Sequence, residues 1–134
     1  YYDVDVTAFG YAIGQQAQMP RSYLPAEQWF YKAQESVARY TSQLHCAPIV
    51  SGDSFVSKKE TRQWIETHFP EAVAVEMEAA AIAQTCYLMD TPFLILRAVS
   101  DNAGEGNTIS YDTFVSQAAA LSAKMNIDFI EHLI

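Results

Sequence analysis

Continuous apolar runs alternate with helically spaced apolar positions along this chain of 134 residues. Runs at 48–50, 72–75 and 93–99 predict buried strands, and the stretch from Met77 to about Met89 between the last two predicts a helix. A strand, a crossover helix and a parallel strand form a βαβ unit, which is almost always right-handed. The pattern therefore predicts an α/β domain with a βαβ unit over 72–99.

Apolar positions at helical spacing predict three further helices. They cover 25–43, 57–68 and about 112–133. Ser57 and Glu60 have the spacing of a capping box, which predicts the start of the second helix. Residues 1–9 alternate between apolar and polar positions, as in a strand whose neighbours lie upstream. We therefore expect the chain to be the carboxyl-terminal part of a longer protein.

The charge and the cysteines narrow the possible partners. A net charge of −8 argues against nucleic acid and anionic membranes, because phosphate binding requires clustered Lys and Arg. No apolar run has the length of a membrane span, and no signal peptide opens the chain, so we expect a cytoplasmic protein. Cys46 and Cys86 are too few for a disulfide scaffold and have no ligand neighbours, which predicts reduced, buried thiols and no metal.

Acidic residues follow two of the predicted strands. Glu76 and Glu78 come after the run at 72–75, and Asp101 comes after the run at 93–99. Ligands of open α/β sheets bind at the carboxyl ends of the strands, so Glu78 and Asp101 are expected to converge on one crevice. A structural interpretation is also open, because carboxylates in a first helical turn complement the helix dipole, and Asp101 could cap the next segment.

The residues alone leave the chemistry of this crevice open. Two carboxylates could serve acid catalysis, sugar-hydroxyl binding or divalent-metal binding. The three histidines share no spacing typical of a metal site or a catalytic triad. No nucleophile elbow, dinucleotide fingerprint or P-loop is present, which argues against those hydrolases and nucleotide-binding proteins.

Two segments resemble the nucleoside phosphorylase/nucleosidase superfamily, and more narrowly the bacterial 5′-methylthioadenosine/S-adenosylhomocysteine nucleosidases. They are Val75–Ala83 and Phe93–Asp101, and Asp5–Tyr11, Ile49–Phe55 and Ser110–Phe114 match the same family in the same order. The resemblance implies a three-layer α/β sandwich with a mixed central sheet, incomplete at its amino terminus. Residues 1–134 would be the carboxyl-terminal part of a single nucleosidase domain, with no cofactor.

The same resemblance implies hydrolysis of the adenine–ribose bond of methylthioadenosine and S-adenosylhomocysteine, a step of methionine salvage. Asp101 would be the general acid that protonates the imidazole ring of the leaving adenine, and Ser100 would orient it. A positioned acid typically contributes about 10²–10⁴-fold. Glu78 would accept hydrogen bonds from the ribose hydroxyls, and its charge would favour an oxocarbenium-like sugar.

The remaining substrate contacts are also implied by the resemblance. Met77 would pack on the ribose, with Glu76 in the same substrate-binding set. Phe55 would stack on the adenine, while the backbone of Val56 reads the base edge. Tyr111 would line the pocket for the 5′-thioalkyl group. Phe9 would reach the neighbouring subunit's pocket in the homodimer that the family forms.

Alternatives remain within and outside this family. No residue of this chain matches the acid that activates the attacking water, so we expect the isolated chain to lack activity. Purine nucleoside phosphorylases share the acidic motifs, but the hexameric ones usually place an Arg after the Ser–Asp pair, and 102–106 contains none. Aminodeoxyfutalosine hydrolysis would use the same residues. An inactive fragment that binds a ligand or dimerises is the non-enzymatic alternative.

Overall fold

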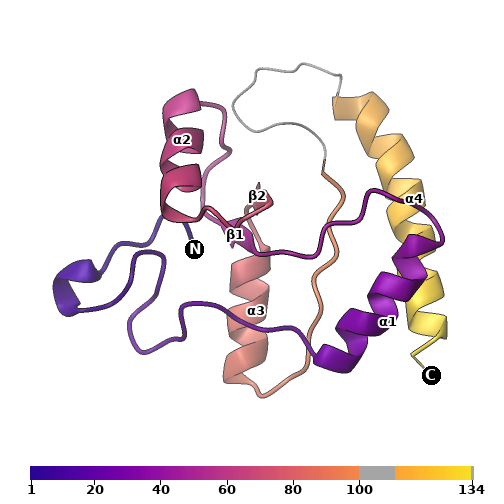
Figure 1. Cartoon of the computed structure of the whole chain (residues 1–134), viewed down its shortest axis with the longest axis horizontal. Helices are drawn as coiled ribbons and strands as arrows, with labels where there is room; N and C mark the ends of the chain where they lie inside the picture. The colour runs from indigo at the N-terminus through magenta and orange to yellow at the C-terminus, as the bar shows by residue number, and fades with distance from the viewer. Residues whose placement is uncertain (100–110, 134) are drawn as a thin grey trace. The chain divides into compact units, whose positions relative to one another are not determined.

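The computed structural model of the chain describes residues 1–99 and 111–133, which divide into two units (Figure 1). The first unit contains Tyr1–Leu24 and Ala47–Phe93, and the second contains Pro25–Cys46 with 94–99 and 111–133. The elements in chain order are η1 (Thr7–Phe9), α1 (Glu27–Ala38), β1 (Ile49–Ser51), α2 (Lys59–His68), β2 (Ala74–Glu76), α3 (Ala79–Leu88) and α4 (Tyr111–Glu131).

A short parallel sheet lies in the first unit. Strands β1 and β2 pair in parallel, with Ile49 opposite Ala74 and Ser51 opposite Glu76, and α2 connects them. This βαβ unit confirms the predicted α/β class, but it lies one element earlier than predicted. The run at 93–99 forms no strand, and Val99 is 63% exposed. An apolar run does not reveal whether a neighbouring strand pairs with it, which is why this prediction was wrong.

The first nine residues contain a 3₁₀ turn in place of the predicted strand. Asp5 Oδ1 accepts hydrogen bonds from the Thr7 backbone N–H at 3.0 Å and from the Thr7 hydroxyl at 2.7 Å. Such local side-chain bonds compete with an extended conformation. Tyr2 makes a bond of the expected kind, donating its N–H to the Ser51 carbonyl at 2.8 Å.

The hydrophobic core of the first unit contains Tyr2, Val50, Val56, Ile65 and Phe69. The Tyr2 ring packs directly over the backbone of Gly52, where an added Cβ would lie 2.3–2.8 Å from three ring carbons. Only glycine therefore fits at this position. The Tyr2 hydroxyl donates to the Ser54 carbonyl at 2.7 Å, so the aromatic ring holds the loop that follows β1.

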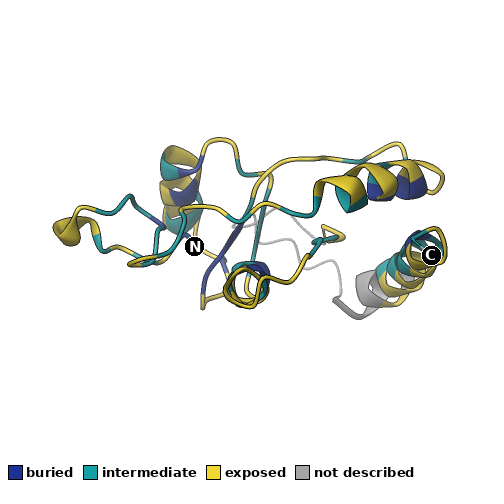
Figure 2. Cartoon of the chain, turned by 90° about the horizontal axis from the view of Figure 1, so that it is seen from below, coloured by how far each residue is buried: buried dark blue, intermediate teal, exposed yellow. Residues whose placement is uncertain are grey.

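The second unit is built on the packing of α1 against α4. Ala33, Ser36 and Val37 are buried along one side of α1 (Figure 2), and Phe129 is buried on α4. α1 ends at Ala38, five residues earlier than predicted. The Thr41 hydroxyl accepts the Gln43 N–H at 3.0 Å, a local bond that competes with continuation of the helix.

The remaining sequence predictions had mixed outcomes. The predicted helices at 57–68, 77–89 and 112–133 are present as α2, α3 and α4. The capping box was wrong, because Lys58 occupies the N-cap position of α2 and its side chain makes no cap bond. Burial of the thiols was also wrong: Cys46 is exposed and Cys86 is half-buried. Within the described ranges, no helix is long and apolar enough to cross a membrane.

Candidate functional site

The carboxyl ends of β1 and β2 meet at one edge, as parallel pairing requires, and this edge carries a polar cluster. Ser51, the last residue of β1, is only 2% exposed. Its hydroxyl donates to Glu76 Oε1 across the strand pair and accepts the Ala80 N–H at 2.8 Å. One buried hydroxyl thus connects the end of β1, the end of β2 and the first turn of α3.

Glu76 continues this cluster through its second carboxylate oxygen. Oε2 accepts the backbone N–H of Glu78 at 3.0 Å and that of Ala79 at 2.8 Å. The first N–H groups of a helix lack intrahelical partners, and an anion is favoured there by the helix dipole. The Glu76 side chain therefore caps the first N–H groups of α3 from a position ahead of the helix. This agrees with the structural interpretation that the sequence left open.

The turn between β2 and α3 presents the two residues assigned to the ribose. Glu78 occupies the N-cap position of α3 with an exposed side chain, and Met77 is 45% exposed. The side chain of Glu78 makes no cap bond to its own helix. The backbone N–H groups of Glu78 and Ala79 are held by the carboxylate of Glu76, while the side chains of Met77 and Glu78 are exposed.

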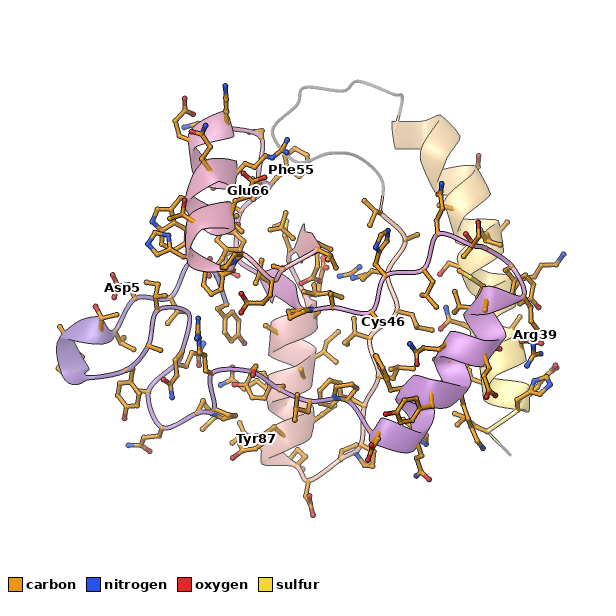
Figure 3. The ribbon with its side chains drawn as sticks, in the orientation of Figure 1. Asp5, Arg39, Cys46, Phe55, Glu66 and Tyr87 are labelled. Carbon is orange, nitrogen blue, oxygen red and sulfur yellow. The ribbon has the colours of Figure 1, made fainter. Side chains whose placement is uncertain are left out.

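Phe55 and Val56 lie on the loop that leaves the same edge, between β1 and α2 (Figure 3). Phe55 is 73% exposed, whereas Val56 is 6% exposed and belongs to the core. The buried Val56 side chain anchors the loop, so the neighbouring aromatic ring is left accessible. This arrangement suits a ring that stacks on a ligand beside a backbone that is held in place.

Phe9 lies elsewhere in the same unit. It ends η1 and is 81% exposed. In both orientations, η1 lies away from β1 and β2 (Figures 1 and 2). Phe9 is therefore not brought to the strand edge of its own chain.

The residue expected to be the general acid is not among those that the structure describes. Ser100 and Asp101 lie outside the described residues, and so does the side chain of Tyr111 at the start of α4. Convergence of Glu78 with Asp101 stays a prediction. The part of the chain that the structure describes contains no group of three or more potential metal ligands.

No role was assigned to Ser51 from the sequence. The signal was available: Ser51 is a small polar residue at the end of an apolar run, one residue before a glycine. A hydroxyl at the end of a buried strand must find a hydrogen-bond partner. Which partner it finds depends on the strand register, and the sequence alone does not contain that register.

A second polar cluster lies in the other unit. The Ser36 side chain is fully buried, and its hydroxyl donates to Asp128 Oδ2. Arg39 Nη1 lies 3.1 Å from Asp128 Oδ2 (Figure 3), and His132 Nδ1 lies 3.8 Å from Asp128 Oδ1. The Ser36 hydrogen bond, assisted by the charges of Arg39 and His132, lowers the pKa of Asp128 against the opposing effect of burial.

The chain is similar to known proteins over nearly its whole length. The family model described as the phosphorylase superfamily matches residues 1–133. The 5′-methylthioadenosine/S-adenosylhomocysteine nucleosidase of Staphylococcus carnosus is 43% identical over 133 residues, which are 99% of this chain and 58% of that protein. The chain thus spans little more than half the length of such relatives.

Several solved structures are similar over nearly the whole chain, and two of them show the range. The Neisseria meningitidis nucleosidase of the same name, in complex with methylthio-immucillin-A, is 47% identical with a TM-score of 0.87, over 98% of this chain and 58% of its own. The futalosine hydrolase of Helicobacter pylori is 32% identical with a TM-score of 0.86, over 98% of this chain and 56% of its own.

Proposed function

Because this chain belongs to the phosphorylase superfamily, we propose that it is the carboxyl-terminal part of a nucleosidase for 5′-methylthioadenosine and S-adenosylhomocysteine. The relatives with that name support the substrate class. The observation that carries the proposal is the strand edge itself, where a fixed turn after β2 carries the exposed Met77 and Glu78 and the loop after β1 carries the exposed ring of Phe55.

The exposed residues of this edge suit a nucleoside. The Glu78 carboxylate accepts hydrogen bonds from two ribose hydroxyls, a pairing that neutral side chains do not offer with the same strength. Met77 packs on the apolar face of the sugar, and its flexible thioether adapts to that face. Phe55 stacks on the adenine ring, because an exposed aromatic side chain gains contact area when a flat base covers it.

Asp101 supplies the proton in this mechanism. The bond between ribose and adenine breaks with its electron pair on the base, and an adenine anion is a poor leaving group. A proton from Asp101 reaches the imidazole ring as the bond breaks, and Ser100 orients the acid. The developing positive charge on the sugar is stabilised by Glu78. Water bonds to the sugar carbon and gives up its proton to a carboxylate that acts as general base, a role for which no residue of this chain matches the family.

The other parts of the proposal concern the surroundings of the site. Tyr111 lines the pocket for the 5′-thioalkyl group. Phe9 enters the pocket of a second subunit in a homodimer, and its 81% exposure leaves the ring available for this contact. A place in methionine salvage and a cytoplasmic location follow from the same substrates.

Two further activities use the same residues. A purine nucleoside phosphorylase would need phosphate as its nucleophile, and the absence of Arg from 102–106 favours hydrolysis. Aminodeoxyfutalosine hydrolysis would use the same residues, and the likeness to the Helicobacter pylori futalosine hydrolase makes it the second candidate. A requirement for phosphate would identify the phosphorylase, and supplying each nucleoside in turn would identify the preferred substrate of a hydrolase.

The test is adenine release from methylthioadenosine in phosphate-free buffer. The full-length protein that contains this chain is expected to release adenine, whereas its Asp101→Asn variant and the isolated 134-residue chain are not. Asp90→Asn is the matched control, because Asp90 is an exposed aspartate in the turn after α3. Adenine release only after phosphate is added would indicate a phosphorylase, and an active Asp101→Asn variant would reject Asp101 as the acid.

A further inference from the structure

We propose that Ser51 and Glu76 are positioning residues, which fix the β2–α3 turn and thereby orient Glu78 and Met77 toward the sugar. We call these two side chains and the backbone N–H groups that they hold the turn clamp. The inference deepens the proposed function and rests on it for the identity of the ligand. It assigns Ser51 a role and moves Glu76 from contact with the substrate to support of its neighbours.

The hydrogen bonds of the turn clamp come from two side chains, one on each strand. Glu76 Oε2 binds the N–H groups of Glu78 and Ala79, at 3.0 and 2.8 Å. The Ser51 hydroxyl binds the next N–H, that of Ala80, at 2.8 Å, and donates to Glu76 Oε1. Three successive backbone N–H groups are therefore held by two side chains that also bind each other.

Burial makes this arrangement specific. Ser51 is 2% exposed, so water does not readily replace either partner of its hydroxyl. Hydrogen bonds to an ionised carboxylate are roughly twice as strong as those between neutral groups. Both oxygens of Glu76 already accept protein hydrogen bonds, which favours a role in holding the turn over a direct contact with the ligand.

The position of Glu78 explains how the turn clamp would affect binding of the sugar. Its own N–H is held by Glu76, and its side chain is exposed at the N-cap of α3. Rotation of this backbone segment would swing the Glu78 carboxylate away from any sugar hydroxyl. A misplacement of about 1 Å can reduce a rate by about 10²-fold even when the chemical groups are intact.

The first test needs no substrate. In Ser51→Ala, amide hydrogen exchange is expected to accelerate by about tenfold or more at residues 78–80, since an opened turn exposes these N–H groups. Ser42→Ala, at an exposed serine, is the matched control and is expected to leave the exchange unchanged. If Ser51→Ala does not fold, Glu76→Gln gives the same readout, because it keeps the size of the side chain and loses its charge. Unchanged exchange at 78–80 in the folded variant would overturn the proposal.

The second test asks whether Ser51 acts through Glu78, using the full-length protein and methylthioadenosine. Ser51→Ala is expected to lower kcat/KM by about 10- to 100-fold in the unmodified protein, and by less than about threefold when Glu78→Gln is already present. Ser51→Thr retains the hydroxyl and is expected to restore part of the activity. Equal losses in both backgrounds would overturn the positioning role.

The two tests separate failure of this inference from failure of the proposed function. If the unmodified full-length protein releases no adenine, the nucleosidase proposal is rejected, and the orientation of Glu78 toward ribose is rejected with it. The exchange measurement still decides whether the turn clamp exists. If adenine is released and the exchange at 78–80 does not change, the function stands and the turn clamp is rejected.

Discussion

Two buried serine–carboxylate pairs, one in each unit, use the same local chemistry for different purposes. Ser51 donates to Glu76 and Ser36 donates to Asp128, and these serines are the most fully buried side chains among the described residues. In each pair a short, rigid donor binds a carboxylate that remains partly accessible. The pairs differ in what else the carboxylate binds.

The other contacts of the carboxylate decide the role of the pair. Glu76 binds backbone N–H groups, whose positions define the path of the chain at a helix start. Asp128 binds the side chains of Arg39 and His132, and Arg39 is 47% exposed. Exposed ion pairs contribute little because water and salt screen them. A carboxylate that holds backbone groups can position a site, whereas one that holds long side chains only joins two helices.

The largest stability effect is expected from removal of the carboxylate of the turn clamp. Glu76→Ala leaves the Ser51 O–H without its acceptor and removes the carboxylate that binds the N–H groups of Glu78 and Ala79, so the free energy of unfolding should fall by about 2–3 kcal/mol. Urea unfolding measures this loss. Glu71→Ala, at an exposed glutamate ahead of β2, is the control and should leave the unfolding free energy nearly unchanged. Equal effects of the two substitutions would show that Glu76 does not cap α3.

A somewhat smaller effect is expected at the residue after Ser51. In Gly52→Ala the new Cβ meets the Tyr2 ring at 2.3 Å, and overpacking of this kind typically lowers stability by about 1–3 kcal/mol. Since Tyr2 also donates to the Ser51 carbonyl, a displaced ring would disturb the strand end that carries the turn clamp.

A double-mutant cycle tests whether the stability loss of Gly52→Ala comes from a clash with the Tyr2 ring. In the Tyr2→Ala background the ring is absent, so Gly52→Ala should add little further loss. Strictly additive losses in the thermal unfolding midpoint would contradict a clash between the two residues.

The smallest effect concerns the second pair and depends on pH. The folded-state pKa of Asp128 is lowered from its ordinary value of 3.8, mainly by the Ser36 hydrogen bond and also by Arg39 and His132. A lowered carboxyl pKa adds stability above the unfolded value, and this contribution is lost as the pH falls through the folded-state pKa. Asp128→Asn should therefore be less stable than the unmodified chain above about pH 4, and the difference should shrink below it.

Thermal unfolding at a series of pH values measures this difference. Glu131→Gln, at an exposed carboxylate on the same helix, is the control and should show no such trend. A difference between Asp128→Asn and the unmodified chain that is constant across the acid range would contradict the assigned pKa shift.

Sequence patterns located the helices of this chain better than its strands. Helical spacing repeats over several turns in α4, so the prediction was supported by many residues. The run at 93–99 has only its apolar composition, which does not identify a pairing partner. The prediction that acidic residues lie at the carboxyl end of β2 was correct, because Glu76 directly ends an apolar run.

The residues that support the site were not visible in the sequence. The bond between Ser51 and Glu76 joins positions 25 residues apart, and it exists because the parallel register sets them opposite each other. Local patterns contain no information about register. The capping box at Ser57 failed for a related reason: the backbone placed Lys58 at the N-cap, one residue beyond the serine.

The comparison of the two serines can be tested in one paired measurement, with Ser51→Ala and Ser36→Ala each made in the full-length protein. The kcat/KM for adenine release from methylthioadenosine would be measured well below both unfolding midpoints. We expect Ser51→Ala to lose about 10- to 100-fold in kcat/KM, while Ser36→Ala keeps the unmodified value despite a lowered midpoint. Equal losses in the two variants, or an unimpaired Ser51→Ala, would contradict the assignment of the first pair to the site and the second to the helix pair.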